Sequence, residues 1–344
     1  MIRLSALVAG FCTGGVALVA TAHAQTLTVS SFGGAYQDAQ RKAFFEPTAE
    51  ALGVTIREET LTGLADVRLQ VQSGNVTWDI ADLGYSECAQ GAREGLFEPL
   101  DYDVIDAEGI DPQMVADDWI GIIYYSTVIA YDTQVFDAET APKTWADFFD
   151  SETFEGLRSL RNEPEVQLEL ALLADGVPRD QLYPLDVDRA FAKLEEIKPD
   201  IGIWWTSGAQ SAQILRDREV DMVAAWNGRI TAIKNDGASA EFTFNDGILN
   251  ADCLVIPKGA PNKELAMKAI AMFVSPEQQA VLPTLIDYGP INAKAFEQGV
   301  ITSEQAAVLP SSPDNMKNQV IMNAEWWAEN GPAIAERWTA FIQQ

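Results

Sequence analysis

The chain has 344 residues, of which 47% are hydrophobic and 22% charged, with 51 acidic side chains against 23 basic ones and a formal net charge of -28. This composition is that of a folded globular protein rather than a disordered acidic tail, and the length favours two lobes over one. Nucleic acid is excluded as a partner, because a phosphate backbone needs a basic surface to neutralise it.

Residues 1–24 have the features of a secretory signal peptide. Arg3 supplies the positive charge, residues 4–20 form the apolar segment, and Ala22-His23-Ala24 matches a small-x-small cleavage site. A membrane anchor is the alternative, but the apolar segment is shorter than the roughly 20 residues that span a bilayer. We therefore predict an exported chain that begins near Gln25 and works in the periplasm.

Removal of this segment would also remove the only histidine, His23. A mature chain without histidine excludes Ser-His-Asp and Cys-His catalysis and zinc sites with imidazole ligands. The motifs of nucleotide-binding loops, serine hydrolases and zinc proteases are absent as well. We expect no cofactor and no metal. An exported carbohydrate-active enzyme remains an alternative, because a carboxylate pair that includes Glu163 or Asp252 would suffice for it.

Two cysteines, Cys88 and Cys253, remain in the predicted mature chain. An oxidising compartment permits a disulfide between them, but nothing in the sequence fixes their separation. A disulfide and a pair of buried thiols therefore both remain open.

Short apolar runs alternate with amphipathic segments in the first part of the chain. The pattern predicts a strand around 27–29, a helix over 35–43 that ends near Pro47, a strand over 53–60, a helix over 63–71 and a buried strand over 78–83. This order is typical of an α/β protein with parallel strands covered by helices. Later segments predict helices over 164–174, 187–197, 262–273 and 324–342, and strands over 220–226 and 254–256.

Two further segments have the length of strands that pass from one lobe to another. Residues 119–131 form an apolar and β-branched run that is longer than a typical strand. Residues 248–257 form the second run, which is interrupted by Asn250 and Asp252. Polar side chains in a buried strand need partners, so these two residues are candidates for a binding site.

Four segments carry a resemblance to a known family: S-S-F-G-G-A-Y at 30–36, A-W-N-G-R at 225–229, D-C-L-V-I-P-K-G-A-P-N at 252–262 and Y-G-P-I-N at 288–292. Their order and spacing resemble the spermidine/putrescine-binding family, the extracellular solute-binding proteins of ABC importers. The resemblance implies a two-lobed, type II-like periplasmic binding protein fold with parallel-rich sheets, helices on both faces and hinge strands. By it, lobe 1 comprises residues 25–125 and 253–292, and lobe 2 comprises residues 126–252 and 293–344.

The resemblance also implies a ligand held in the cleft between the lobes, which close on it. An ammonium group in such a cleft needs a carboxylate partner and aromatic faces. Asp252 matches the amine-binding aspartate of the family, Trp226, Tyr288 and Tyr36 match aromatic contacts, and Ser86 matches a polar contact. The full set of predicted ligand-binding residues is Phe32, Gly34, Tyr36, Ser86, Arg161, Glu163, Trp205, Trp226, Arg229, Asn250, Asp252 and Tyr288. Whether Trp204 or Trp205 enters the cleft stays open.

The sequence departs from polyamine-binding relatives at the second lobe. Those relatives carry an acidic pair there, whereas this chain keeps Glu163 and has Val166 at the other position. Arg229 and Arg161 would suit a ligand that bears a carboxylate as well as an amine. The predicted solute is therefore a polyamine such as putrescine or spermidine, or an ω-amino acid such as 4-aminobutyrate. In the alternative, Arg229 pairs with surface acids.

Two other binding functions share this fold. A ferric-ion binder is suggested by Tyr124-Tyr125, but alternation along a strand sends these side chains to opposite faces. A ligand-sensing subunit of a membrane receptor would differ only in its partner. We expect a monomer that captures a small amine-bearing or zwitterionic solute and delivers it to the transmembrane subunits of an ABC permease.

Overall fold

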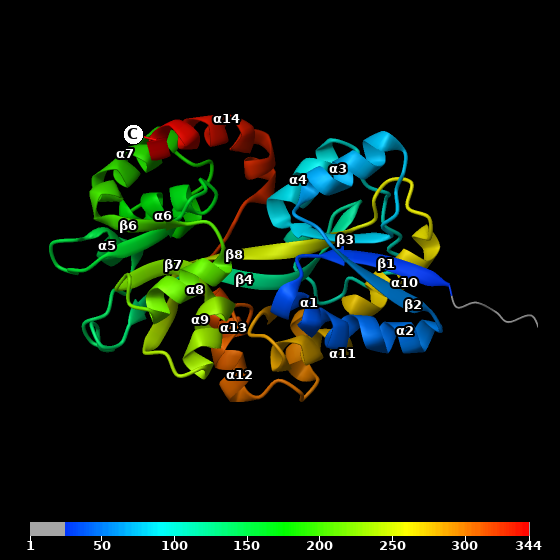
Figure 1. Cartoon of the computed structure of the whole chain (residues 1–344). Helices are drawn as coiled ribbons and strands as arrows, with labels where there is room; N and C mark the ends of the chain where they lie inside the picture. The colour runs from blue at the N-terminus through cyan, green and yellow to red at the C-terminus, as the bar shows by residue number, and fades with distance from the viewer. Residues whose placement is uncertain (1–24, 344) are drawn as a thin grey trace, which may run out of the picture.

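The computed structural model describes residues 25–343, so the predicted signal peptide lies outside the described residues. Within this range ten strands form one mixed sheet, whose main path runs β2-β1-β3-β8-β4-β7-β5-β6. Figure 1 shows helices above and below this sheet and two long strands, β4 and β8, that pass through its centre. The fold is therefore α/β with two lobes joined by crossing strands, as predicted.

The first lobe contains strands near the N-terminus and helices on both of their faces. Its strands are β1 (Thr26–Ser31), β2 (Thr55–Thr60) and β3 (Ile80–Gly84), and β1 pairs in parallel with both others. Its helices include α1 (Gly34–Gln40), α2 (Glu46–Leu52), α3 (Leu64–Ser73), α4 (Tyr85–Arg93), α10 (Lys263–Phe273) and α11 (Pro276–Val281). Strand β9 (Gly289–Pro290) adds to β4 at its first-lobe end.

The second lobe repeats this plan with strands from the middle of the chain. Its strands are β5 (Arg158–Arg161), β6 (Ile201–Trp205) and β7 (Met222–Trp226), and β5 pairs in parallel with both others. Its helices include α5 (Trp145–Phe149), α6 (Gln167–Ala174), α7 (Val187–Ile197), α8 (Gly208–Arg216) and α9 (Asn227–Asn235). The last part of the chain holds α12 (Ser303–Val308), α13 (Pro313–Met316), β10 (Val320–Ile321) and α14 (Ala324–Gln343).

The crossing strands β4 (Trp119–Asp132) and β8 (Ala240–Val255) form an antiparallel ribbon, with Trp119 opposite Val255 at one end and Asp132 opposite Ala240 at the other. β8 begins eight residues before the predicted start at 248. The added segment contains Phe242 and Phe244, whose rings lie 5.2 Å apart, and aromatic residues favour strands. The two crossing strands therefore reach across both lobes.

The predicted end of the first helix near Pro47 is wrong. Helix α1 continues through a π-helical segment (Arg41–Phe45) into α2, and Pro47 lies in the first turn of α2. A proline is tolerated there because the first turn of a helix does not need its missing N–H. The helical region that flanks the sheet therefore extends to Leu52.

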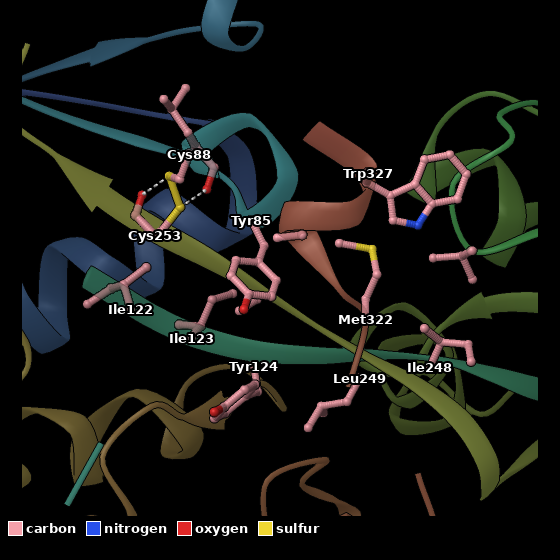
Figure 2. Close-up of a cluster of buried hydrophobic side chains, with 14 of the residues drawn as sticks. Tyr85, Cys88, Ile122, Ile123, Tyr124, Ile248, Leu249, Cys253, Met322 and Trp327 are labelled. Atoms are coloured by element: carbon pink, nitrogen blue, oxygen red, sulfur yellow. Dashed lines mark hydrogen bonds between the residues drawn. A yellow bond between two sulfur atoms is a disulfide. The ribbon is translucent and has the colours of Figure 1, made fainter. Parts of the chain in front are cut away.

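Helix α14 covers the junction between the lobes. Just before it, the Met322 N–H donates to the Leu249 carbonyl of β8, and within it the Trp327 indole donates to Glu169 of α6 at 2.6 Å. Figure 2 shows Met322 and Trp327 beside the buried residues of β4 and β8. Farther along α14, Trp338 packs against Trp204 with ring centroids 5.7 Å apart. Trp204 therefore faces α14 and does not line the cleft.

A disulfide resolves the question that the sequence left open. Cys88 of α4 is bonded to Cys253 of β8, and both residues are fully buried (Figure 2). The bond closes a loop between residues 165 positions apart in the sequence. It thereby ties the first turns of α4 to the strand that carries Asp252.

Replacement of both Cys88 and Cys253 with alanine should lower the free energy of unfolding by about 2–4 kcal/mol, because the crosslink restricts the unfolded chain. Urea unfolding of the oxidised protein and of the double variant, compared by midpoint and slope, measures this difference. Equal midpoints would contradict a stabilising role for the bond.

Candidate functional site

A cavity of about 330 Å³ lies between the lobes, at the lower end of the size range of small-molecule pockets. Its walls come from segments that follow strands in both lobes and from the crossing strands themselves. The lining residues are Phe32, Gly33, Tyr36, Thr62, Gly84, Ser86, Glu87, Tyr125, Arg161, Glu163, Glu165, Trp226, Arg229, Asp252 and Tyr288. Nine of the twelve predicted residues belong to this set: Phe32, Tyr36, Ser86, Arg161, Glu163, Trp226, Arg229, Asp252 and Tyr288.

Three predicted residues lie outside the cavity lining. Gly34 is the exposed first residue of α1, and its neighbour Gly33 takes the place on the cavity wall. Trp205 is buried behind the wall, where its indole donates to the Ala224 carbonyl at 2.9 Å. Asn250 is buried on β8 and contacts the sulfur of Met322.

One end of the cavity is acidic. Asp252 of β8 lies opposite Gly84 of β3, and Asp82 lies opposite Leu254, so the two carboxylates share one face of the sheet. Asp82 accepts hydrogen bonds from Ser31 and Gln40, yet its Oδ1 has no partner. Asp252 forms no ion pair among the described residues, and the Tyr36 hydroxyl lies close enough to lower the pKa of both carboxyl groups. A cationic group would compensate the charge of this pair in its ionised form.

Burial raises the pKa of both carboxyl groups. The pKa of Asp252 is well above its ordinary value because protein surrounds the group, and the nearby Asp82 raises it further. Burial raises the pKa of Asp82 to about 7, against the lowering effect of its hydrogen bonds. A bound ammonium group would favour the ionised forms and so offset this cost.

Four aromatic side chains form the middle of the cavity. The rings of Tyr36 and Tyr288 meet edge to face at 5.7 Å, and Tyr125 meets Trp226 in the same way at 5.7 Å. Tyr125 and Tyr288 are 6.2 Å apart. Tyr124, in contrast, does not line the cavity, as strand alternation predicts. These faces suit methylene groups and an ammonium ion.

The second lobe contributes two arginines to the cavity wall, and their surroundings differ. Arg161 pairs with Glu163 at 2.5 Å, and its guanidinium lies 5.2 Å from the ring centre of Trp226. Arg229, at the start of α9, is half-buried and has no carboxylate within 4.0 Å among residues 25–343. Its Nε is buried and has no hydrogen-bond partner. The predicted alternative of a surface ion pair for Arg229 is therefore wrong.

The unpaired guanidinium affects its aromatic neighbour. Burial raises the pKa of Tyr288 to about 12, and the positive charge of Arg229 limits this rise. The Asn227 side chain holds the start of α9 against this segment by donating to the Asp287 carbonyl at 2.8 Å. Arg229 thus lines the cavity beside Tyr288, with a buried Nε that has no hydrogen-bond partner.

Several lining residues were not predicted from the sequence, and Glu165 and Tyr125 are the most informative of them. Glu165 accepts a hydrogen bond from Ser86 at 2.8 Å across the cavity. Its position depends on Val166, whose φ of 73° turns the chain before α6 begins at Gln167. No spacing rule reveals such a turn, and alternation along β4 indicates only that Tyr124 and Tyr125 lie on opposite faces of the strand.

The described part of the chain contains no helix with the length and apolar character of a membrane span. A two-lobed fold around an interlobe cavity lined by charged and aromatic side chains defines a protein built to hold a small solute.

Comparison with known proteins agrees with this class. Residues 42–309 match the model of the bacterial extracellular solute-binding protein family. The chain is 36% identical over 332 residues to the gamma-aminobutyric acid-binding protein of Pseudomonas aeruginosa, which covers 94% of this chain and 93% of the relative. It is 25% identical over 253 residues to the spermidine/putrescine-binding periplasmic protein of Salmonella typhimurium, in a match that covers 71% of this chain and 70% of the relative.

Solved structures show the same architecture. An ABC transporter substrate-binding protein from Bradyrhizobium japonicum has a TM-score of 0.89 and 48% identity, over 92% of this chain and 99% of that one. The Atu4243–GABA receptor has a TM-score of 0.85 and 39% identity, over 92% and 97%. The binding protein MotA from A. tumefaciens B6 in complex with glucopine has a TM-score of 0.84 and 37% identity, over 92% and 99%.

The chain therefore belongs to the bacterial extracellular solute-binding protein family. The predicted resemblance to the spermidine/putrescine-binding proteins is confirmed, and so is the expectation of solute capture for an ABC importer. The named relatives are binding proteins rather than enzymes, which gives no support to the carboxylate-pair hydrolase.

Proposed function

We propose that the protein is the periplasmic, monomeric solute-binding subunit of an ABC importer and that it captures an ω-amino acid, with 4-aminobutyrate favoured over polyamines. Residues 1–24 would direct its export. The observation that carries the proposal is that the cavity brings together Asp252, on the end of β8 that pairs with the first lobe, and Arg229, from the second lobe, neither of which forms an ion pair within residues 25–343.

A diamine would satisfy only one of these two groups. Its first ammonium group could approach Asp252, but its second would lie among side chains that include the uncompensated Arg229, and like charges repel. An ω-amino acid offers a carboxylate to Arg229 and an ammonium group to Asp252, with methylene groups between the aromatic rings. The names of the Pseudomonas aeruginosa relative and of the Atu4243–GABA receptor support this choice.

Binding would also favour the closed arrangement of the lobes. Arg229 belongs to the second lobe and Asp252 to the end of β8 that pairs with β3 of the first, so one solute would contact both. A ligand shifts a conformational equilibrium only by its differential affinity for the two states. A zwitterion that contacts both lobes only when they are closed would bind the closed state more tightly than the open state.

The test is a tryptophan-fluorescence and calorimetric titration of the mature protein with 4-aminobutyrate, putrescine, spermidine and glucopine. We expect micromolar or tighter binding of 4-aminobutyrate at a stoichiometry of one, with at least about 100-fold weaker binding of both polyamines. Preferred binding of a polyamine or of glucopine, with 4-aminobutyrate silent, would contradict the proposal.

A further inference from the structure

Glu165 lies in the cavity wall without a role in the binding of a zwitterion as proposed above. It is partly buried in the loop between β5 and α6, and its carboxylate accepts a hydrogen bond from Ser86 of α4 at 2.8 Å. The two residues are 79 positions apart and line opposite walls of the cavity. This contact can form only when the walls are close together.

The backbone holds Glu165 in place at a cost. Val166 has φ of 73° and ψ of -43°, in a region where a β-branched residue is strained, and its side chain is buried. Such a residue persists only where the surrounding structure fixes it, and strained residues cluster at functional sites. The backbone is therefore not helical at Val166, and this conformation directs the Glu165 side chain toward Ser86.

No cation compensates the Glu165 carboxyl group. Among the described residues no lysine or arginine lies within 4.0 Å of it, and the nearest guanidinium, Arg161, is paired with Glu163. Six ionisable side chains surround Glu165, and they come from every element packed around it. They are Tyr125 of β4, Arg161 of β5, Glu163 of the following loop, Glu87 of α4, Glu169 of α6 and Tyr183 of the segment before α7. Acids outnumber the one cation in this set.

We propose that Glu165 enters the closed cavity as a neutral carboxylic acid and so selects a solute with one ammonium group over a solute with two. The inference rests on the proposed capture of an ω-amino acid. An ionised Glu165 would offer a second ammonium group an ion-pair partner, and would leave an uncompensated charge when a zwitterion is bound. The neutral acid keeps the hydrogen bond with Ser86 and removes both effects.

The direction of the pKa shift of Glu165 agrees with the buried position of its carboxyl group beside Ser86. Burial and, to a smaller extent, the charge of the neighbouring Glu163 raise the pKa of Glu165 from its ordinary value to about 8. When water reaches the group in an open cleft, its pKa returns toward the ordinary value. Closure around 4-aminobutyrate then takes up a proton from solvent between roughly pH 5 and pH 8, so affinity is highest at low pH and falls as pH rises toward 8.

The experiment measures the affinities of 4-aminobutyrate and putrescine by calorimetry between pH 6 and pH 9, in wild type and Glu165→Gln. Both solutes place an ammonium group at Asp252, so the titration of Asp252 and Asp82 cancels in the ratio of the two affinities. In wild type we expect the ratio to fall by at least about tenfold across this range, since each pH unit of proton uptake is worth up to about tenfold. In Glu165→Gln the ratio should stay within about twofold.

Proton uptake gives a second readout, which decides the question if putrescine binds too weakly to measure. Titrations with 4-aminobutyrate at pH 7 in buffers of different ionisation enthalpy give the net number of protons taken up, to which Asp252 and Asp82 also contribute. Because that contribution is common to both proteins, the net uptake of wild type should exceed that of Glu165→Gln by nearly one proton. Glu50→Gln, at an exposed position on α2, makes the same chemical change outside the cavity and should behave as wild type.

A ratio independent of pH in wild type, or the same pH dependence in Glu165→Gln, would overturn the inference while 4-aminobutyrate still binds. If wild type does not bind 4-aminobutyrate at all, the proposed function is overturned instead. A melting temperature of Glu165→Gln near that of wild type shows that the variant is folded and that its affinities can be compared.

Discussion

Replacement of Arg229 with alanine is expected to weaken 4-aminobutyrate binding on the order of 100-fold or more. Removal of one member of a desolvated charge pair costs about 2–5 kcal/mol, because the remaining carboxylate loses its hydrogen bonds and stays buried. The Arg229 side chain lines the cavity without a carboxylate partner in residues 25–343, so no other ion pair competes for it. Isothermal titration calorimetry of both proteins measures the change.

Two controls separate loss of this contact from general damage. Arg57→Ala removes a guanidinium whose side chain is 66% exposed and pairs only with Glu59 on the surface, so it should leave the affinity unchanged. Arg229→Lys keeps the charge but loses the fork geometry, and its affinity should lie between wild type and the alanine variant. An affinity of Arg229→Ala within about threefold of wild type would remove Arg229 from the site.

Asp252→Asn should weaken binding by a similar factor and, at the same time, make the ligand-free protein more stable. The affinity falls because the ammonium group loses its ionic partner, a loss of about 2–4 kcal/mol. The stability rises because a carboxyl group whose pKa is raised on folding opposes folding at pH 7. The folded protein must then hold a proton that the unfolded chain releases.

Thermal unfolding without ligand, together with calorimetry, tests both parts of this prediction. We expect a higher melting temperature for Asp252→Asn than for wild type at pH 7, and a smaller difference at about pH 3, where the unfolded carboxyl group is also largely protonated. Asp180→Asn, at an exposed position, serves as the matched control. A variant that keeps wild-type affinity would show that the amine binds elsewhere.

The sequence was sufficient to predict the architecture because the relevant signals are local. The unusual length of the 119–131 run predicted a crossing strand, and β4 covers the same residues with one addition. Asp252 was a candidate because it interrupts an apolar strand. Alternation along β4 assigned Tyr124 and Tyr125 to opposite faces, although it could not say which of them faces the cavity.

The missed features depend on contacts between distant segments or on an unusual backbone conformation. The separation of Cys88 from Cys253 is set by the pairing of β3 with β8, which no local pattern encodes. Glu165 was passed over because a regular helix start would have placed Val166 at the functional position. The positive φ of Val166 delays the helix and gives that position to Glu165.

The pairing of β8 between β3 and β4 has a consequence for the order in which the chain can fold. As the polypeptide is made from its N-terminus, β1 to β4 are complete at residue 132, but the strand that separates β3 from β4 ends only at residue 255. Until then the facing edges of β3 and β4 have no partner, and exposed strand edges invite aggregation. The first lobe is therefore completed only after the second has been made, and a truncated chain that ends before β8 should require a chaperone to stay soluble.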